Sequence, residues 1–306
     1  MKKPLRTILK WLLVFLGIVV AVGAFSLTPL SIPETSHTLP PLSEIRAFAV
    51  SSGQPLPREV RTLKVATNIT PRMVIIAGEG LREQQMVSYT YQLVYSDGRT
   101  VLIDAVADDE TMKATFPKSH VLPDAYARMQ EAMRKADHIV VTHEHFDHAS
   151  GISRSSFLAE IAPRVNMTEA QLHGRNAEWA LFTPDVVQRL TPLRYDRLHL
   201  LAPGVVLVKA PGHTPGSQMV YVKLADGREL LFVGDIAWNM DNIRLPRAHS
   251  RWVNWALPED GHAIVDQLRY LHDLMQQEPS VHLVVAHDPV QLEGYVRDGL
   301  LVEGLK

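Results

Sequence analysis

The longest uncharged hydrophobic stretch of the chain lies near the N-terminus, from Trp11 to Ile32. A helix of about 20 apolar residues spans a bilayer, so residues 1–32 are predicted to form a single transmembrane anchor. Basic residues precede the stretch and are expected to stay in the cytoplasm, which places the rest of the chain on the periplasmic or extracellular side. They are Lys2, Lys3, Arg6 and Lys10. The alternative is a signal peptide cleaved near Ala24, which would release a secreted form.

A proline-containing segment without clear periodicity runs from Pro33 to about Thr70 and is predicted to be a tether followed by an irregular lead-in. Residues 33–60 of it are predicted to be a linker. Residues 61–306 are predicted to form one domain. In this domain, short hydrophobic runs bounded by Gly, Asp or Pro predict strands. The predicted strands cover Arg72 to Gly78, Met86 to Tyr95, Arg99 to Ala105, His138 to Thr142, Val205 to Lys209, Met219 to Leu224, Glu229 to Val233 and His282 to Val285.

Apolar residues at helical spacing occur between these strands and predict helices. The predicted helices cover Asp124 to Ala136, Ile152 to Ile161, Thr168 to Ala180 and Gly261 to Gln277. Strands and helices thus occur in both halves of the domain. The chain is therefore predicted to be an α/β protein that forms a four-layer αββα sandwich, with helices outside two packed sheets.

Composition narrows the possible chemistry. A chain of 306 residues with 46% hydrophobic and 21% charged residues can bury a sizeable core. The formal net charge of -2 and the lack of a basic tract beyond the N-terminus argue against a nucleic-acid partner. The chain contains no cysteine, so any metal must be held by His, Asp or Glu. The expected partners are a small-molecule substrate and the membrane, whereas the sequence does not indicate an oligomeric state.

The segment from Val140 to Gly151 reads V-V-T-H-E-H-F-D-H-A-S-G and concentrates potential metal ligands. On an extended segment alternate side chains share a face, so His143, His145 and Asp147 are expected to point the same way and Glu144 away from them. Residues 149–151 are expected to turn the chain, which would direct Asp147 and His148 towards a second metal. Imidazole and carboxylate without thiolate suit zinc, and also iron or manganese.

Three later segments each end a predicted strand with a polar residue. They are P-G-H-T-P-G around His213, V-G-D at Asp235 and V-A-H-D at His287. Taken singly, each would be an ordinary polar residue in a turn. Together with H-x-H-x-D-H, the series resembles the motifs of the metallo-β-lactamase superfamily over roughly residues 70 to 290, and looks most similar to its lactonase-like branch.

The resemblance implies a site for two divalent metal ions, with zinc expected and iron or manganese as alternatives. His143, His145 and His213 match the ligands of the first metal. The ligands of the second are matched by Asp147, His148 and His287, and the carboxylate that bridges both metals by Asp235. Asp147 also matches the family residue that passes a proton to the leaving group. Asp104 resembles the aspartate that orients the ligand loop, the alternative being a simple turn residue.

The resemblance implies a metal-dependent hydrolase that attacks an ester, lactone or related acyl bond with a hydroxide shared by the two metals. Asp235 argues against β-lactamase activity, because true β-lactamases typically lack an aspartate at this position. Family lactonases usually carry a tyrosine three residues after the bridging aspartate, where this chain has Trp238. The alternatives are a mononuclear iron sulfur dioxygenase, a phosphodiesterase of the same fold and a metal-binding module without turnover.

Five residues, three of them tryptophans, are candidates for the walls of the substrate pocket. Trp238, Asn239 and Met240 follow the predicted bridging aspartate closely and are expected to line the pocket, with core packing as the alternative for Trp238. Trp252 and Trp255 are expected to serve in packing or as pocket walls.

Overall fold

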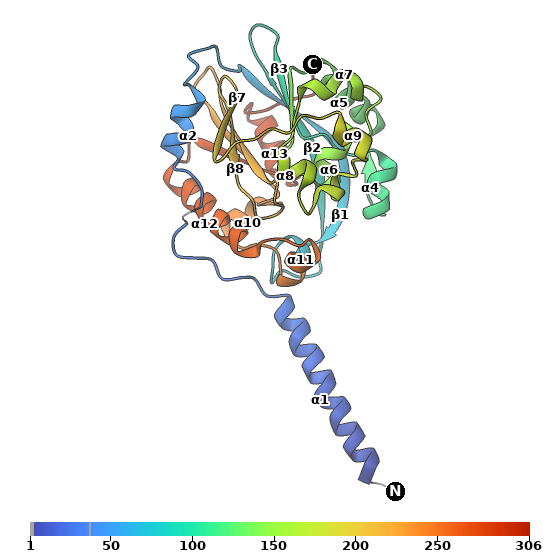
Figure 1. Cartoon of the computed structure of the whole chain (residues 1–306). Helices are drawn as coiled ribbons and strands as arrows, with labels where there is room; N and C mark the ends of the chain where they lie inside the picture. Colours follow the sequence, from blue (N-terminus) through green and yellow to red (C-terminus); the bar gives the residue numbers. More distant parts are fainter. Residues whose placement is uncertain (1–2, 37) are drawn as a thin grey trace.

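The computed structural model describes the backbone of residues 3–36 and 38–306 and the side chains of residues 8–36 and 38–306. Lys2 and the side chains of Lys3 and Arg6 lie outside the described residues. Helix α1 (Lys3–Ser26) projects as a single rod from a globular unit that holds the other elements (Figure 1). Its segment Ile8–Ser26 is long and apolar enough to cross a membrane, and none of it is buried. A helix that belonged to the protein core would be buried, so the two interpretations left for α1 are a membrane anchor and a signal sequence.

Two mixed sheets form the centre of the globular unit. Within the described residues, the first sheet has seven strands in the order β12-β1-β2-β3-β5-β6 with β4 paired to β1, and the second has five in the order β11-β10-β9-β8-β7. The first contains β1 (Glu59–Pro71), β2 (Glu83–Val94), β3 (Thr100–Ile103), β4 (His120–Val121), β5 (His138–Val140), β6 (Val165–Asn166) and β12 (Val302–Glu303). The second contains β7 (Leu198–Ala202), β8 (Val205–Lys209), β9 (Gln218–Lys223), β10 (Glu229–Gly234) and β11 (Val281–Val285).

Strands β8 and β10 of the second sheet are almost continuous hydrophobic runs because both of their faces are buried. In β10, Leu230 and Phe232 point between the sheets, where the ring of Phe232 lies 4.7 Å from that of Tyr91 on β2. Leu231 and Val233 point to the opposite face, towards the helices. Alternation along one strand therefore joins the two sheets to each other and to their helical cover.

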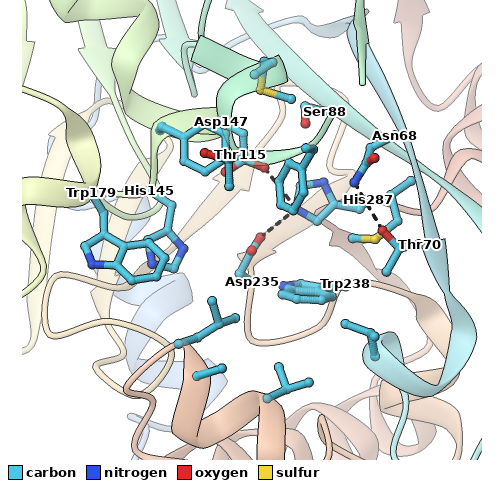
Figure 2. Close-up of a pocket in the computed structure, with 18 of the residues that line it drawn as sticks. Asn68, Thr70, Ser88, Thr115, His145, Asp147, Trp179, Asp235, Trp238 and His287 are labelled. Atoms are coloured by element: carbon cyan, nitrogen blue, oxygen red, sulfur yellow. Dashed lines mark hydrogen bonds and ion pairs between the residues drawn. The ribbon is translucent and has the colours of Figure 1, made fainter. Parts of the chain in front are cut away.

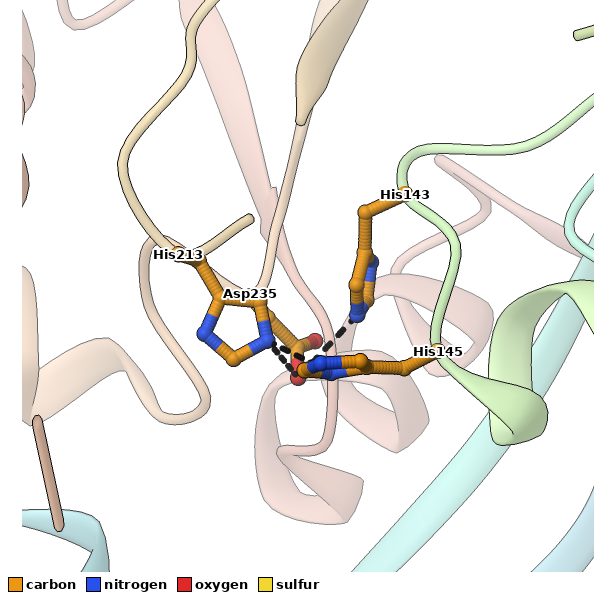
Figure 3. Close-up of side chains that lie close together, drawn as sticks. All are labelled: His143, His145, His213 and Asp235. Atoms are coloured by element: carbon orange, nitrogen blue, oxygen red, sulfur yellow. Dashed lines mark hydrogen bonds and ion pairs between the residues drawn. The ribbon is translucent and has the colours of Figure 1, made fainter. Parts of the chain in front are cut away.

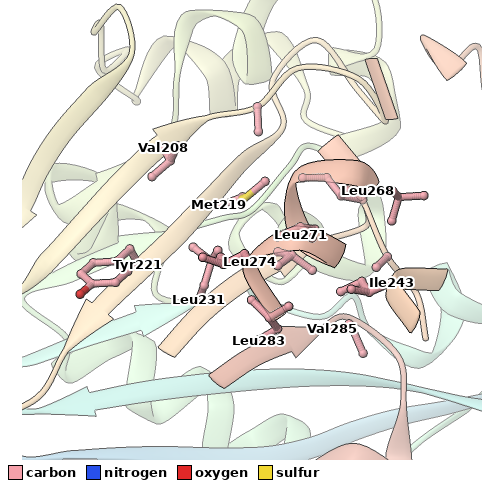
Figure 4. Packing of buried hydrophobic residues seen from close by; sticks show 14 of the residues in the cluster. Val208, Met219, Tyr221, Leu231, Ile243, Leu268, Leu271, Leu274, Leu283 and Val285 are labelled. Atoms are coloured by element: carbon pink, nitrogen blue, oxygen red, sulfur yellow. The ribbon is translucent and has the colours of Figure 1, made fainter. Parts of the chain in front are cut away.

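Helices cover the outer faces of both sheets. Helix α12 (Gly261–Gln277) lays Leu268, Leu271 and Leu274 on the second sheet, in contact with a cluster that includes Leu231 (Figure 4). The same face carries α2 (Leu42–Ala49) and α10 (Met240–Arg244). The other helices are α3 (Arg72–Ile75), α4 (Asp109–Thr115), α5 (Pro123–Lys135), α6 (Phe146–Ser153), α7 (Leu158–Ile161), α8 (Glu169–His173), α9 (Pro184–Gln188), α11 (Arg251–Ala256) and α13 (Pro289–Arg297), with 3-10 turns η1 (Ala162–Arg164) and η2 (Ala177–Ala180). The predicted α/β four-layer sandwich is confirmed.

The segment between the apolar helix and the domain contains more structure than the sequence predicted. Strand β1 covers residues that were expected to be irregular, because it pairs along its length with β2. Helix α2 falls inside the predicted linker and buries Leu42, Ile45 and Ala49, which lie on one helical face, against the second sheet. The division into an anchor over 1–32, a linker over 33–60 and a domain over 61–306 stays a prediction.

Three local predictions were wrong. Arg72 to Gly78 is not a strand, because Pro71 breaks β1 and the chain forms the single turn α3, which buries Ile75. The helix predicted to continue to Ile161 is two helices, since the hydroxyl of Ser155 accepts a hydrogen bond from the backbone N–H of Phe157 and starts a new turn. The helix predicted over Thr168 to Ala180 ends at His173, where Gly174 leaves the helical conformation.

Candidate metal centre

The ligand-rich segment changes conformation within a few residues. β5 ends at Val140, His143 and His145 lie in the following loop, and α6 begins at Phe146. The predicted alternation therefore holds only as far as His145, which has extended backbone angles and precedes the helix. Asp147 and His148 lie in the first turn of α6. The turn expected at residues 149–151 is wrong, because these residues continue the helix, whose geometry separates the side chains of Asp147 and His148 from those in the loop.

The other predicted ligands lie at the ends of strands of the second sheet. His213 occupies the turn after β8, and His287 follows β11. Asp235 directly follows β10, where Gly234 has a positive φ of 55° and the pairing with β11 shifts register. A residue with a side chain would be strained in this backbone conformation, which glycine adopts readily. The conformation turns the chain so that Asp235 points towards the loop after β5.

The structure brings all seven predicted ligands together in two adjoining groups. His143, His145, His213 and Asp235 form the first (Figure 3), and Asp147, His148 and His287 the second. The potential ligand atoms of each group lie within 4.8 Å of one another. All seven side chains are buried.

Asp235 belongs to the first group and borders the second, with one carboxylate oxygen towards the histidines of each group. Its Oδ2 is 3.8 Å from Nε2 of His143 and 3.4 Å from Nε2 of His213. Its Oδ1 is 3.2 Å from Nε2 of both His148 and His287. A carboxylate so placed can interact with a cation in each group.

The histidine nitrogens of the first group are not fully satisfied by hydrogen bonds to one another and are suited to binding a metal ion. Nε2 of His213 and Nδ1 of His145 approach to 2.9 Å, while Nε2 of His143 is buried without a hydrogen-bond partner among the described residues. An unpaired buried donor or acceptor costs free energy, which a ligand would recover. Burial, and then the neighbouring His148 and His213 respectively, lower the pKa of His143 and His145 well below the usual range. These rings are therefore neutral, which is the form that binds a metal.

Residues outside the two groups fix the orientation of the histidine rings. Asp104, whose φ is 62°, accepts hydrogen bonds from the backbone N–H of Thr142 at 2.7 Å and from Nδ1 of His148 at 2.8 Å. Nδ1 of His287 donates to the carbonyl of Val87 at 3.1 Å. In both rings Nε2 is left to face Asp235. The contacts of Asp104 thus fit the orienting position that was predicted for it.

Glu259 plays the equivalent part for His213 and was missed from the sequence. Its side chain is 0% exposed and accepts hydrogen bonds from Nδ1 of His213 at 2.6 Å, Nδ1 of His249 at 3.1 Å and the amide of Asn254 at 2.5 Å. Burial alone would raise the pKa of Glu259, but His249 and His213 lower it well below the usual range. Glu259 is therefore an anion that fixes the His213 tautomer. Its sequence surroundings, Pro258-Glu259-Asp260, resemble an ordinary polar turn and gave no signal.

Glu144 lies outside both groups, as its place in the alternation predicted. Its buried carboxylate accepts hydrogen bonds from the hydroxyl of Thr214 at 2.6 Å and from the backbone N–H of Gly216 at 3.3 Å. Burial raises the pKa of Glu144 above its usual value. The residue therefore joins the loop after β5 to the turn that carries His213.

A cavity of about 280 Å³ opens beside the two groups (Figure 2). His145, Asp147, Asp235 and His287 border it on one side, and the remaining wall is mostly apolar. That wall includes Val74, Met86, Met112, Phe116, Phe146, Trp179, Trp238, Trp252, Val253, Ala256 and Leu257. The cavity is near the lower end of the range of about 300–1,000 Å³ for small-molecule sites. A small molecule with an apolar part suits it.

Of the residues that were expected near the pocket, two tryptophans line the cavity and the others do not. Trp238 lines the cavity, and its buried indole N–H has no hydrogen-bond partner among the described residues. Trp252 also lines it, whereas Trp255 is 79% exposed. Asn239 and Met240 do not line the cavity, because they cap and begin α10. Trp179, missed from the sequence, lines the cavity and lies 4.9 Å from the ring of His145.

Comparison with known families agrees with this geometry. The family model described as "Metallo-beta-lactamase superfamily" matches residues 87–287, which contain every residue of the two groups. The chain belongs to the metallo-beta-lactamase superfamily. The family resemblance predicted from the motif series is thereby confirmed.

Curated members of the superfamily are similar to the chain at low identity. A probable metallo-hydrolase of Mycobacterium tuberculosis is 28% identical over 218 residues, which cover 56% of this chain and 64% of that protein. An N-acyl homoserine lactonase of Bacillus thuringiensis is 24% identical over 148 residues, covering 45% of this chain and 57% of the lactonase. The matched part of the chain thus spans less than two thirds of the length of these relatives.

A solved structure of the superfamily shares the fold. It is an N-acyl homoserine lactone hydrolase with the product N-hexanoyl-L-homoserine bound at its catalytic metal center. The two structures align with a TM-score of 0.61 at 14% identity, over 78% of this chain and 96% of the hydrolase. This likeness shows that the two proteins share a fold, in agreement with the family match.

Proposed function

We propose that this protein is a dinuclear, zinc-dependent hydrolase of an ester, lactone or related acyl bond. The observation that carries the proposal is the position of Asp235, whose two oxygens face two separate groups of histidine and carboxylate donors. His143, His145 and His213 would hold one metal, Asp147, His148 and His287 the other, and Asp235 both. When bound, two such cations lower the pKa of a shared water and polarise the acyl oxygen.

The protein's own residues supply positioning and proton transfer. Oδ2 of Asp147 lies 3.7 Å from Nε2 of both His148 and His287, and Asp147 also borders the cavity. Its carboxylate can therefore accept a proton at the reacting centre and release it to the leaving oxygen. Asp104 and Glu259 hold His148 and His213 in the required tautomers.

Trp238 is proposed to bind the acyl oxygen of the substrate. Its ring lines the cavity and lies beside Asp235 (Figure 2), and its buried indole N–H has no hydrogen-bond partner among the described residues. A preorganised donor at a position where negative charge develops stabilises the transition state. This role would replace that of the tyrosine found at the corresponding position of family lactonases.

The apolar wall of the cavity and the similarity to lactonases favour an acyl substrate. Tryptophan, phenylalanine and methionine side chains bind a hydrocarbon chain, while the donor groups lie at one end of the cavity, where a polar acyl bond would be placed. A phosphodiester carries a charge that this wall does not complement, and a mononuclear iron dioxygenase would leave the second donor group without a purpose.

We further propose that α1 anchors the protein in a membrane, with the catalytic domain on the periplasmic or extracellular side. The exposed apolar segment Ile8–Ser26 and the basic residue Lys10 before most of it support this orientation. A reporter fused after Lys306 should be active outside the cytoplasm, and activity only inside would contradict the orientation. Recovery of a shortened soluble form would favour cleavage near Ala24.

The hydrolase assignment can be tested with protein purified without added metal. Elemental analysis should give close to two metal ions per chain, and a panel of acyl esters, lactones and phosphodiesters should show turnover of the acyl compounds. Turnover of phosphodiesters alone would contradict the proposal and identify the protein as a phosphodiesterase. One bound iron with oxygen uptake on a persulfide substrate would instead make the protein a dioxygenase.

A further inference from the structure

Helix α11 connects the end of α1 to the wall of the cavity. Arg251, its first residue, donates its backbone N–H to the carbonyl of Thr28 at 3.2 Å, and its guanidinium lies 4.7 Å from the ring centroid of Phe25 in the last turn of α1. The next residues of α11, Trp252 and Val253, line the cavity. Because α1 ends at Ser26, a single residue separates it from the contact at Thr28. The cavity wall therefore lies close to the end of the candidate membrane span.

The outer side of this region is unusually apolar. Trp255 is 79% exposed, Leu81 is 76% exposed and Trp252 is 50% exposed. We call these three residues the apolar rim. Leu81 lies in the turn between α3 and β2, and Ile76 of this turn belongs to the same buried cluster as Val253 of α11. Figure 1 shows α11 at the end of the globular unit from which α1 extends.

The composition of the apolar rim fits a membrane interface better than an ordinary surface. Single exposed apolar residues are common on soluble proteins, and Val290, on α13, is one that is 80% exposed. Tryptophan, by contrast, is enriched at the headgroup level of bilayers, because its ring is apolar and its N–H polar. Arg82 follows Leu81 and is exposed, and Arg251 precedes Trp252. Basic side chains at these positions would complement lipid phosphates.

We propose that the apolar rim docks on the bilayer that α1 spans, and that the cavity takes its substrate from that bilayer. The substrate class is an ester or lactone with a long acyl chain. Trp252 belongs to both the rim and the cavity wall, so an acyl chain can move from the lipid along continuous apolar surface. The polar acyl bond would then reach Asp147 and Asp235 at the far side of the cavity. This proposal rests on the proposed anchorage and hydrolase function.

Docking can be measured with a fluorescent probe at a single position, because the chain contains no cysteine. The full chain carrying Trp255→Cys is labelled with bimane and reconstituted into phosphatidylcholine and phosphatidylglycerol vesicles that contain nitroxide lipids. Val290→Cys, labelled in the same way, is the matched exposed control on another helix. Quenching at 255 should exceed that at 290 several-fold. Equal quenching at both positions would overturn the docking surface. Disulfide formation between copies of the unlabelled Trp255→Cys protein would show that the rim contacts a second copy of the chain and not the bilayer.

The source of the substrate is tested by chain length. In vesicles, the rate on a twelve-carbon acyl lactone divided by the rate on a four-carbon one should fall at least five-fold in Leu81→Gln/Trp255→Gln, and stay unchanged in Val290→Gln. An unchanged ratio in the double variant would overturn uptake from the bilayer. The quenching result decides docking even if the wild type hydrolyses none of the acyl compounds, an outcome that would instead contradict the proposed function.

Discussion

Glu259 accepts a hydrogen bond of 2.6 Å from Nδ1 of His213, and both side chains are 0% exposed. The two residues are far apart in sequence, and the bond leaves Nε2 of His213 to face Asp235 and His145. The carboxylate fixes the tautomer of the ring and makes its free nitrogen a stronger donor. Glu259, which belongs to none of the sequence motifs, thus fixes the tautomer of His213, which is one of the predicted metal ligands.

Glu259→Gln should therefore weaken the first metal site without removing it. The amide keeps the shape of the side chain but loses its charge, and loss of such a partner typically lowers metal affinity about 10–100-fold. Competition with a chromophoric chelator measures the effect. Glu293→Gln, at a side chain that is 67% exposed, is the control and should bind metal as the wild type does. Wild-type affinity in Glu259→Gln would show that Glu259 does not support His213.

Asp147→Asn should separate proton transfer from metal binding. The first donor group contains no atom of Asp147, so its metal should be retained. Turnover should fall by a factor on the order of 10² or more, because an amide cannot carry the proton to the leaving group. Metal content and kcat are measured on the same preparation. A variant with wild-type kcat would remove Asp147 from the reaction.

His287→Ala and Asp235→Ala should differ in metal stoichiometry. The first substitution removes one donor of the second group and should lose about one metal per chain. The second removes the carboxylate that faces both groups and should weaken both sites, since its charge offsets that of each cation. Elemental analysis after dialysis distinguishes these results. One tightly bound iron, unchanged in His287→Ala, would contradict a dinuclear centre.

Trp238→Phe should lower kcat more than it changes KM. The substitution keeps an aromatic ring at the cavity wall and removes the unpartnered N–H. A preorganised donor to a developing negative charge is worth on the order of 10²-fold in rate, so a fall of roughly 10-fold to 10²-fold is expected. Steady-state kinetics on an acyl ester, with the melting temperature as a check on folding, measure this. An unchanged kcat would leave Trp238 with a packing role alone.

Gly151→Ala, near the C-terminal end of α6, should lower the stability of the protein. An added Cβ would lie 2.6 Å from the carbonyl oxygen of Val106 and 2.8 Å from backbone atoms of Ala105, and neither neighbour is a flexible side chain. Relief of such a clash costs about 1–3 kcal/mol of unfolding free energy. Gly294→Ala on α13, where the nearest atom would be 3.6 Å away on Arg297, is the control and should not destabilise. Urea denaturation of both variants compares them, and equal stability would contradict the clash.

Much of the fold and all of the predicted donor set could be read from local patterns. Central strands such as β10 are continuous hydrophobic runs because both faces are buried, and α12 has apolar residues at helical spacing along its whole length. Most of the donors follow within a few residues of a strand end, as with Asp235 after β10, whereas Asp147 and His148 lie in the first turn of α6. The sequence carries such features because each depends on residues a few positions apart.

The elements that were missed depend on partners far along the chain. Strand β1 contains polar residues and ends at a proline, and its conformation comes from pairing with β2. Helix α2 is only eight residues long and is stabilised by packing on the second sheet. Short segments of this kind gain little from their own propensity, so tertiary contacts decide their structure.

The sequence by itself determined which side chains could bind metal and roughly where the strands that present them end. The tertiary structure decided that Asp235 has one oxygen towards each donor group, that Glu259 supports His213, and that α11 joins the cavity wall to the end of α1. These relationships are distances between residues that lie on different elements. Hydrophobic and hydrogen-bonding patterns specify single elements, whereas the packing of the two sheets and their helices fixes the distances between them.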